Sequence, residues 1–521
     1  MRIIDFFDRG ASLDPGRTFL VSESGKETSY AQAQVDSIAI AKALCAKGIE
    51  KGDVVGVLSP NVPEAMLAIL GIWRAGAVWV PLNPRNALHG TIGLMNDINC
   101  RALFIHEVFE TELVMIRAET PGLDVIVSLG TSFGTAQSFD LFIEQGAHTD
   151  LRDWGDPEGN PTDTCTAFPT GGTTGRSKVV QWTNSVWLTL QETAERSWPD
   201  MTGAVYLLVA PMTHAAGVLA VLFASTGSTV VIQSGFDAEN VLESIQEHRV
   251  THLFLPPTAF YGLTDAQERS PRDVSSLKML LVAAAPVSPD RLARGAKVFG
   301  DCVSQCWGQA EAPMMLTYLD AETITAARQG IGRERLSSCG RATHLSQVAA
   351  MDDQGMLLPA GQSGELVARG SLVAPGYLGN PEETAATRTH GWHHTGDIGR
   401  IDDDGFVYIL DRKEDMIISG GFNVYASEVE AALFEFEQVQ QCAVIGVPDD
   451  KWGEAVTAVV VARNGFCDKE ALIGHAKRQL GSVKAPKDVV FVDTIPMTAV
   501  GKIDKNSLRE TYWAGRERSV N

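Results

Sequence analysis

Apolar runs alternate with amphipathic segments along the first 300 residues, and this rhythm predicts strands and helices in turn. VVGVLS at Val54–Ser59 predicts a buried strand. PEAMLAILGIWR at Pro63–Arg74 predicts a helix with proline in its first turn and Gly76 at its end. Further β-rich runs stand at Ala77–Pro81, Val205–Ala210, Ser228–Gln233, Thr251–Leu255 and Lys278–Val282. Such alternation predicts an α/β fold with largely parallel sheets.

The pattern changes near residue 400, where short strands and Gly/Asp turns replace the longer rhythm. Ser427 with Glu430 three residues later predicts a capping box that opens a helix. The other elements predicted here are strands at Glu365–Arg369, Phe406–Leu410, Cys442–Val447, Val456–Ala462 and Val489–Val492, and a helix near Asp468–Leu480. We therefore place a domain boundary near Asp411, with a smaller α+β unit after it.

Composition narrows the class of protein. The chain has 521 residues, 45% hydrophobic and 21% charged, as expected for a globular enzyme of roughly three or four domain-sized units. The net charge of −21 disfavours nucleic acid or an anionic membrane surface as a partner, but it leaves room for a small polyanionic ligand. No apolar run reaches the roughly 18 residues of a membrane span, and Asp5 and Asp8 interrupt the N-terminal segment. We expect a cytoplasmic protein.

The eight cysteines form no CxxC pair. Cys302 and Cys306 have the spacing CxxxC, which is a weak metal signal without a second half. Three histidines, His390, His393 and His394, also stand close together, but no set of cysteines or carboxylates is arranged around them. We expect reduced core thiols and a solvated histidine turn.

The segment PTGGTTGRSK, Pro169–Lys178, combines glycines, threonines and a lysine in ten positions. Glycines let backbone N–H groups approach a phosphate, hydroxyls donate hydrogen bonds and lysine adds charge. The P-loop pattern does not fit, because Gly175 stands three residues before Lys178 and Val179 follows the lysine. The alternatives are a phosphate loop of another design and a flexible surface turn.

This loop has companions in a set order along the chain. They are PMTHAAG with His214, CWGQAEAP with Trp307 and Glu311, GWHHTGD with Asp397, DRKEDMIISGG with Arg412, and PMTAVGKIDK with Lys502. Together with Ser59–Pro84, their order and spacing resemble the adenylate-forming acyl-CoA synthetase superfamily, which includes luciferases and nonribosomal peptide adenylation domains. The resemblance covers about residues 20 to 510.

The resemblance implies a large N-terminal domain, residues 1–411, of two doubly wound α/β lobes plus a small β-barrel-like segment. A small mobile α+β C-terminal domain, residues 412–521, would follow a hinge at Glu414, where relatives more often have Asp or Lys. The implied reaction has two steps. A carboxylate attacks the α-phosphate of ATP to give acyl-AMP and pyrophosphate, and a thiol, usually that of coenzyme A, then displaces AMP.

The resemblance also assigns roles to residues. Lys502, His214, Glu311 and Thr174 would be catalytic, and Glu311 and Thr174 would also reach the Mg²⁺ that accompanies ATP. The implied ATP and AMP site comprises Thr170, Gly171, Gly172, Thr173, Thr174, Gly175, Lys178, Ala284, Ala285, Pro286, Trp307, Gly308, Gln309, Ala310, Asp397, Arg412 and Lys502. Ala310 is a departure, because relatives usually carry threonine there, and it removes one donor worth ~1 kcal/mol.

The implied acyl pocket comprises His214, Ala215, Gly217, Val218, Ala283 and Ala285, and coenzyme A would contact Ser419, Gly420 and Gly421. The pocket stretches carry no Arg or Lys to pair with a second carboxylate. We therefore expect a monocarboxylic acid with an aliphatic or aromatic apolar body.

The leading interpretation is an ATP-dependent acid–CoA ligase that needs Mg²⁺. The alternatives are an adenylation enzyme that loads a separate carrier protein, a luciferase-like oxygenase and a non-catalytic nucleotide sensor. The expected partners are the acid, ATP and coenzyme A, without nucleic acid or a membrane span. A homodimer remains open.

Overall fold

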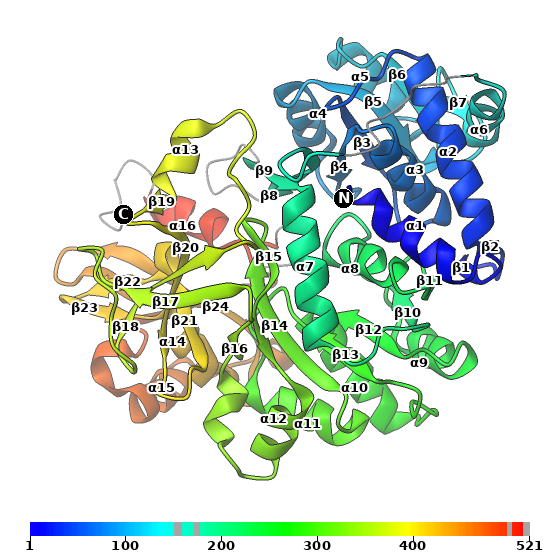
Figure 1. Ribbon diagram of the computed structural model, residues 1–521. Helices are drawn as coiled ribbons and strands as arrows, with labels where there is room; N and C mark the ends of the chain where they lie inside the picture. The colour runs from blue at the N-terminus through cyan, green and yellow to red at the C-terminus, as the bar shows by residue number, and fades with distance from the viewer. Residues whose placement is uncertain (151–158, 171–177, 498–502, 514–521) are drawn as a thin grey trace. The chain divides into compact units, whose positions relative to one another are not determined.

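In the computed structural model, the described residues are 1–150, 159–170, 178–497 and 503–513. The chain divides into two compact units (Figure 1). The first contains Met1–Gln347 and Ala368–Gly391, and the second contains Val348–Val367 and Trp392–Asn521. The predicted boundary at Asp411 lies inside the second unit, and it stays a prediction.

The first unit contains a seven-stranded sheet in the order β7-β6-β5-β3-β4-β8-β9, with only β9 antiparallel to its neighbour in the described residues. Its strands are β3 (Val54–Leu58), β4 (Val78–Leu82), β5 (Cys100–Ile105), β6 (Val125–Ser128), β7 (Gln137–Ser138), β8 (Thr164–Thr170) and β9 (Lys178–Thr183). Its helices are α2 (Tyr30–Ala46), α3 (Pro63–Arg74), α4 (Leu88–Asp97), α5 (Leu113–Glu119) and α6 (Phe139–Ala147), with the short η1 (Glu107–Phe109).

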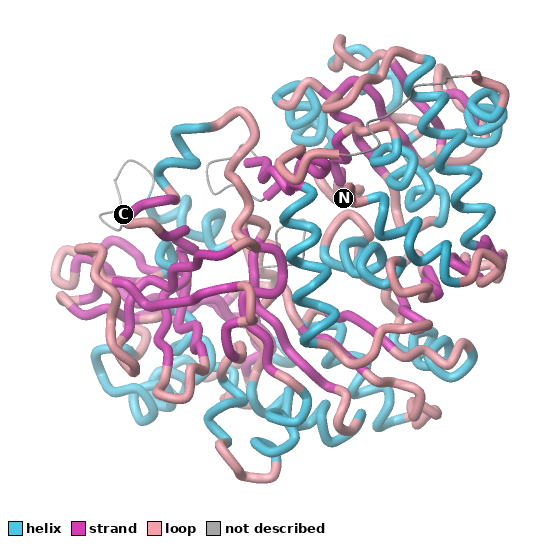
Figure 2. The backbone as a smooth tube through the Cα atoms, viewed as in Figure 1, coloured by secondary structure: helices cyan, strands magenta, loops and turns pink. Residues whose placement is uncertain are grey.

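Both faces of this sheet are buried. Neighbouring side chains of a strand point to opposite faces, and the consecutive residues Leu103, Phe104 and Ile105 of β5 are all buried. Leu103 and Ile105 of β5 pack in a core cluster that also holds residues of α4 and α5. Phe104, between them, meets Phe142 of α6, with the ring centroids 5.8 Å apart. Helix α2 packs on α3 and α6 (Figure 2). Helices therefore cover the sheet on two sides, which explains why its strands read as continuous apolar runs.

A second sheet of the same unit has the order β16-β15-β14-β13-β12-β10-β11-β1-β2. Its strands are β1 (Thr18–Val21), β2 (Glu27–Ser29), β10 (Val205–Leu208), β11 (Thr229–Ile232), β12 (His252–Leu255), β13 (Met279–Val282), β14 (Val303–Gln309), β15 (Ala312–Leu319) and β16 (Arg341–Ala342). The helices along the same stretch are α1 (Ile4–Leu13), α7 (Asn184–Ser197), α8 (Ala215–Ala224), α9 (Ala238–Glu247), α10 (Pro257–Arg269), α11 (Pro289–Phe299), α12 (Ala321–Arg328) and η2 (Arg333–Ser337). Later in the chain, α13 (Pro381–Ala386) and β19 (Arg388–Thr389) complete the unit.

Parallel pairing runs through the middle of this second sheet, from β14 to β1. Helix α8 covers it through Phe223, which stacks on Tyr206 of β10 with a centroid distance of 4.9 Å. Helix α10 packs against α9 and α11. The predicted α/β fold with parallel sheets is confirmed.

The second unit is built on two smaller sheets. In one, β18 (Ser363–Gly370) lies between β17 (Ser346–Met351) and β20 (Trp392–Ile401), and β21 (Val407–Arg412) pairs antiparallel with β20. A small β-barrel-like segment was expected within residues 1–411, whereas β20 and β21 of this sheet belong to the second unit and β21 ends at Arg412. The other has the order β23-β22-β25-β24, with β26 beside β25. Its strands are β22 (Ile417–Ser419), β23 (Phe422–Val424), β24 (Val439–Asp449), β25 (Gly453–Ala462) and β26 (Asp488–Phe491).

Three helices pack with this last sheet, as expected of an α+β C-terminal domain. They are α14 (Ala426–Phe434), α15 (Lys469–Lys484) and α16 (Lys505–Trp513), with the short turns η3 (Lys413–Asp415) and η4 (Arg463–Gly465). Val429 and Leu433 of α14 join Leu472 of α15 and Val444 and Val460 of the strands in one buried cluster.

The capping box predicted at Ser427 and Glu430 is wrong. The N-cap of helix α14 lies two residues before Ser427, at Tyr425, and has no side-chain cap. The Ser427 hydroxyl donates to the carbonyl of Leu410 instead, and Glu430 Oε1 accepts from the backbone N–H of Val444 at 2.7 Å. Long-range partners have taken both side chains away from the helix end.

All eight cysteines are free, and all but Cys45 are buried, as predicted. Burial raises the pKa of Cys302 and of Cys306 to about 12, as expected of thiols in the core. Within the described ranges, no helix is long and apolar enough to cross a membrane.

Candidate active site

The two ends of the predicted phosphate loop are held by a strand pair. Thr170 ends β8 and Lys178 begins β9, and the two residues lie opposite each other in the antiparallel ladder. The Thr170 hydroxyl donates to the carbonyl of Lys178 at 3.3 Å. The other predicted loop residues, Gly171, Gly172, Thr173, Thr174 and Gly175, lie outside the described residues, as does Lys502.

Lys178 and Glu311 both contact Tyr377, a residue that the sequence reasoning did not identify. The Lys178 ammonium lies 5.6 Å from the centroid of the Tyr377 ring and forms an ion pair with Glu383. The Tyr377 hydroxyl donates to Oε1 of Glu311 at 2.7 Å. One aromatic side chain therefore joins the predicted phosphate lysine to the predicted metal carboxylate, within the first unit.

An aromatic group connects His214 to the turn at Ala310. Trp182 of β9 stacks on Phe168 of β8 with centroids 4.7 Å apart, and Phe168 meets the His214 ring edge-on at 6.2 Å. The Trp182 indole N–H donates to the carbonyl of Ala310 at 2.7 Å. His214, the start of the loop and the end of β14 thus form one packed region.

Asn61 fixes the loop that precedes His214. Its amide oxygen accepts from the N–H of Met212 at 2.7 Å, and its amide nitrogen donates to the carbonyls of Ala210 and Gln233, each at 3.0 Å. Asn61 follows β3 of the seven-stranded sheet, whereas Gln233 follows β11 of the second sheet. One side chain therefore connects the ends of both sheets at this loop.

The predicted acyl-pocket residues differ in exposure. His214 is half-buried at the N-cap of α8, and Ala215 begins that helix. Val218 is fully buried, and a Cβ on Gly217 would lie 1.9 Å from the carbonyl oxygen of Met212. Gly217 and Val218 therefore hold the helix against the loop, while His214 and Ala215 stay partly accessible.

Further predicted residues of the nucleotide site and of the acyl pocket lie at the ends of two neighbouring strands, β13 and β14. Ala283 is buried and directly follows β13, and Ala284, Ala285 and Pro286 come next. Ala284 has a φ of +77°, a left-handed conformation that is rare for alanine and that often marks functional turns.

Trp307, Gly308 and Gln309 end β14, and the turn with Ala310 and Glu311 leads into β15. A Cβ on Gly308 would lie 2.6 Å from the backbone of Met314, so this close approach requires glycine.

In the second unit, Asp397 and Arg412 face each other across β20 and β21. Arg412 Nη1 donates to Asp397 Oδ1 at 2.9 Å, where the Asp397 side chain is 9% exposed and that of Arg412 47%. Burial alone would lower the pKa of Arg412, but the carboxylates around it, Asp397 first, together outweigh burial and raise that pKa above its ordinary value. The Asp397 carboxylate is therefore nearly buried and lies in an ion pair with the more exposed Arg412.

The Gly420–Gly421 turn joins β22 to β23, with φ values of +60° and +81°. The N–H of Gly420 donates to the carbonyl of Trp452 at 2.8 Å, and a Cβ there would come within 2.8 Å of the Trp452 ring. A Cβ on Gly421 would meet no atom within 4 Å, so space remains beside it. Ser419, just before the turn, is buried.

The predicted hinge, Glu414, lies in η3 beside a buried group of charges. Asp415, the next residue, pairs with Arg509 and with Lys505, both on α16. Lys505 also pairs with Glu430 of α14 at 2.8 Å. Helix α16 begins three residues after the predicted catalytic lysine, so these charges attach the helix to the residues beside Glu414.

The histidine segment is not the solvated turn that was expected. His393 is 4% exposed, and His394 Nδ1 lies 3.0 Å from Glu365, which also pairs with Lys413 at 3.0 Å. His390 is exposed with a φ of +54°. In the described part of the chain, no group of three or more His, Cys, Asp and Glu side chains is placed to hold a metal.

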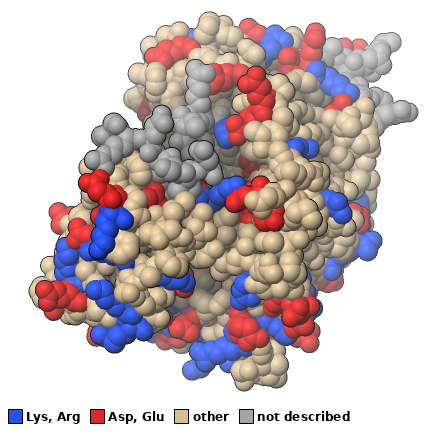
Figure 3. Space-filling view, turned by 90° about the vertical axis from the view of Figure 1, so that its left-hand side faces the viewer, with Lys and Arg blue, Asp and Glu red and all other residues tan. Residues whose placement is uncertain are grey.

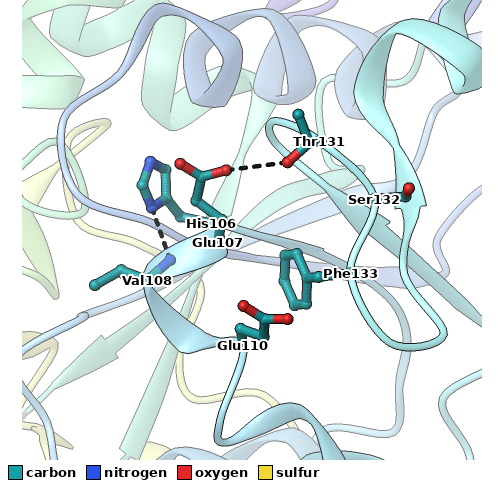
Figure 4. Close-up of a pocket in the computed structure, with 7 residues that line it drawn as sticks. All are labelled: His106, Glu107, Val108, Glu110, Thr131, Ser132 and Phe133. Atoms are coloured by element: carbon teal, nitrogen blue, oxygen red, sulfur yellow. Dashed lines mark hydrogen bonds between the residues drawn. The ribbon is translucent and has the colours of Figure 1, made fainter.

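A hollow of about 660 Å³ lies elsewhere in the first unit, and none of the predicted site residues lines it (Figure 4). It is formed by His106, Glu107, Val108, Glu110, Thr131, Ser132 and Phe133. His106 Nδ1 accepts from the N–H of Val108 at 3.2 Å, and the Thr131 hydroxyl donates to Glu107 at 3.4 Å. Two of its polar side chains, His106 and Glu107, therefore accept hydrogen bonds from other lining residues.

Comparison with known proteins identifies the family of this chain. The family model described as AMP-binding enzyme matches residues 7–378, and that described as AMP-binding enzyme C-terminal domain matches residues 428–502. The chain belongs to the AMP-binding enzymes, the adenylate-forming superfamily to which acyl-CoA synthetases belong.

Two curated relatives are CoA ligases. A medium/long-chain-fatty-acid–CoA ligase, FadD8 of Mycobacterium tuberculosis, is 36% identical over 91% of this chain and 84% of its own length. A feruloyl-CoA synthase of Amycolatopsis sp. is 33% identical over 97% of this chain and 98% of its own. These relatives confirm the predicted class, an AMP-forming acid–CoA ligase, which is an enzyme that forms carbon–sulfur bonds.

A solved structure extends the comparison. The amide bond synthetase McbA from Marinactinospora thermotolerans is similar at a TM-score of 0.86 and 29% identity, over 98% of this chain and 100% of that one. Solved structures with the same fold include some with ATP bound. The fold is therefore that of ATP-using, adenylate-forming enzymes.

Sequence reasoning missed Tyr377, Glu383, Trp182 and Asn61. Glu383 is 205 positions from Lys178, and Tyr377 is 66 positions from Glu311. No local spacing predicts such contacts. The only available signal was that Tyr377 and Glu383 lie in a Gly/Pro-rich segment, PGYLGNPEE, between predicted elements.

Proposed function

We propose that this chain activates a monocarboxylic acid with an apolar body as acyl-AMP and transfers the acyl group to coenzyme A. The observation that carries the proposal is the contact chain Lys178–Tyr377–Glu311. Tyr377 contacts both the lysine that we propose for ATP's phosphates and the carboxylate that we propose for their metal ion. These are the two charges that a phosphate-transfer site needs.

The residues present fit a magnesium ion that arrives with ATP. Oε1 of Glu311 accepts from Tyr377, which leaves Oε2 for a hard cation. Mg²⁺ in such sites uses one or two carboxylates together with substrate phosphates, so Glu311 is sufficient as a protein ligand and Thr174 would be a second. When bound, the ion would offset phosphate charge. Turnover that persists in excess chelator would exclude it.

The apolar body of the acid is supported by the surroundings of His214. Phe168 meets the His214 ring, Trp182 stacks on the Phe168 ring, and α8 begins at the residue after His214. These neighbours offer aromatic rings and small alkyl groups. No Arg or Lys occurs in Ala215–Leu219 or Ala283–Ala285 to pair with a second carboxylate. A fatty or aromatic monocarboxylate suits such a wall better than a short dicarboxylate.

In the second half-reaction, we assign the open space beside Gly421 to the pantetheine arm and Asp397 to the ribose of the nucleotide. Glu414 would be the hinge and Lys502 the lysine at the α-phosphate in the adenylating step. His214 would orient or gate the acyl group. These roles follow the family motifs, and the geometry of Gly421 and of Asp397 supports them.

The test is a matrix of acids and acceptors. Fatty, aromatic and dicarboxylic acids are each supplied with ATP and Mg²⁺, and with coenzyme A, a simple amine or no acceptor. Pyrophosphate release reports adenylation, and mass spectrometry identifies the product. We expect a coenzyme A thioester of an apolar monocarboxylate. If malonate gave the highest kcat/KM, the proposal of a monocarboxylic acid with an apolar body would be contradicted. If an amide formed in place of the thioester, the amine and not coenzyme A would be the acceptor.

A further inference from the structure

Lys178 has a protein counter-ion where the resemblance places ATP's phosphates. Its ammonium forms an ion pair with Glu383, and the two side chains are 28% and 30% exposed. Both residues belong to the first unit. A carboxylate and a phosphate cannot both approach one ammonium closely without repelling each other. Glu383 therefore occupies the partner position that a phosphate needs.

Lys178 is held by a second contact that does not compete with a phosphate. The Tyr377 ring lies 5.6 Å from its ammonium, and an aromatic face attracts a cation without neutralising it. The ring is fixed in turn, because the N–H of Tyr377 donates to the Thr384 hydroxyl at 2.9 Å and the Tyr377 hydroxyl donates to Glu311. If Glu383 moves away, Lys178 keeps this support.

Glu383 lies on a helix that is lightly packed. Helix α13 has six residues, none of them buried. A hollow of about 420 Å³ lies beside it, lined in part by Tyr377, Thr384 and Arg388. The backbone N–H of Glu383 is capped by Asn380 at 3.1 Å, so the helix start is fixed while the Glu383 side chain reaches out to Lys178. Rotation of that side chain into solvent disturbs no core contact.

We propose that Glu383 is an exchangeable counter-ion, which pairs with Lys178 in the empty site and yields it to the phosphates of ATP. The inference rests on the proposed function, because it takes ATP as the ligand. It makes Glu383 a positioning residue: it acts through Lys178 and touches no reacting atom. After adenylation the carboxylate returns to the lysine and favours the departure of pyrophosphate.

The test is equilibrium binding of Mg·ATP, and separately of Mg·pyrophosphate, by calorimetry without acid or coenzyme A. Partly exposed ion pairs are weak, so Glu383→Gln should lower both dissociation constants about two- to fivefold, equivalent to about 0.4–1 kcal/mol. Glu382→Gln is the matched control, because it removes the same charge one position earlier from an exposed side chain. We expect less than about a 1.5-fold change for it, since solvent and salt screen that charge.

A Lys178→Ala background distinguishes two effects of the Glu383 carboxylate on binding: its competition with phosphate for Lys178, and its direct repulsion of the phosphates. There, Glu383→Gln should change the dissociation constants no more than Glu382→Gln does, because the shared lysine is absent. Three results would each overturn the inference. They are an equal gain in affinity from Glu383→Gln with and without Lys178, an equal gain in affinity from Glu383→Gln and Glu382→Gln, and weaker binding by Glu383→Gln.

The failures of the two proposals are distinguishable. If the unaltered protein binds Mg·ATP and forms thioester but Glu383→Gln binds no more tightly, the counter-ion role is wrong and the ligase stands. If the unaltered protein binds neither Mg·ATP nor Mg·pyrophosphate, both proposals fall together.

Discussion

The Lys505→Met variant tests whether the buried charges beside η3 hold the second unit together. Lys505 pairs with Glu430 at 2.8 Å and lies 3.8 Å from Asp415, and the side chains of Lys505 and Glu430 are only 13% and 16% exposed. Burial alone would lower the pKa of Lys505, but the carboxylates around it, Glu430 first, outweigh this and raise that pKa. Methionine has a similar length and no charge, so the variant leaves Glu430 buried without its cation.

The expected cost follows from the burial of the pair. Removing one partner of a buried ion pair costs about 3–5 kcal/mol, and the residual exposure places this case near 3 kcal/mol. For a domain of this size, 1 kcal/mol shifts the midpoint by about 2–4 °C, so the second unit should unfold about 10 °C lower. Differential scanning calorimetry measures that transition, and hydrogen exchange across α14, β24 and α16 shows where protection is lost.

A matched control is Lys469→Met. Lys469 also pairs with a carboxylate of the second unit, Asp488, but the two side chains are 46% and 55% exposed. Exposed pairs contribute about 0–1 kcal/mol, so the midpoint of this variant should fall by less than about 4 °C. Equal losses in the two lysine variants would refute the reasoning.

Two further measurements identify Glu430 as the cause. Glu430→Gln combined with Lys505→Met should recover most of the loss, because no unpaired charge remains buried. Burial raises the pKa of Glu430 above its ordinary value, so its folded form takes up a proton more readily than the unfolded form. This residue therefore stabilises the variant as pH falls towards that raised pKa, and the deficit of Lys505→Met should shrink in the same direction. A deficit that grows on acidification would contradict this.

Three other predictions concern the reaction. Lys502→Ala should lose acyl-AMP formation but still convert supplied acyl-AMP to thioester, whereas Gly421→Leu should form acyl-AMP but transfer the acyl group slowly to coenzyme A. Single-turnover assays of each half-reaction measure the two steps. Equal loss of both steps in both variants would count against two working conformations. Tyr377→Phe should slow pyrophosphate release roughly tenfold, because hydrogen bonds to charged groups contribute about 1.5–3 kcal/mol. Glu311→Gln should slow pyrophosphate release further. An unchanged rate for Tyr377→Phe would show that the Tyr377 hydroxyl has no role in the site. Asp397→Ala should raise the dissociation constant of AMP about tenfold in equilibrium binding, and unaltered affinity would exclude a ribose contact.

Sequence patterns correctly predicted those helices and strands that are determined by residues close together in the chain. Val54–Ser59 became β3, and Pro63–Arg74 is α3 with the predicted limits, because a continuous apolar run and an N-terminal proline act within a few residues. The strands and helix predicted after Cys442 correspond to β24, β25, α15 and β26, although β24 and β25 extend further. The ladder between these two strands adds residues that the apolar pattern alone does not include.

The wrong predictions share a different cause. Ser427 and Glu430 have the spacing of a helix cap, but each found a partner distant in sequence. His394 likewise pairs with Glu365 from another strand. Polar side chains are satisfied wherever the fold brings a partner, and that choice is made by tertiary structure.

The predicted site divides in the same way. Motifs placed Lys178, Glu311, Asp397 and Arg412, because each stands in a short recognisable segment. On the face in Figure 3, acidic and basic side chains are interspersed among the described residues, so charge on this face would not have located a site. Tyr377, which joins the motif residues, has no motif of its own.

The Asn61 side chain has a consequence for the order of folding. Its three hydrogen bonds reach 149 to 172 positions along the chain, so they can form only when both parallel sheets exist. The loop that carries His214 is therefore completed at the docking of the sheets and not during the growth of either one. In a refolding experiment, the return of activity would report that docking event, whereas the return of helical signal would come earlier.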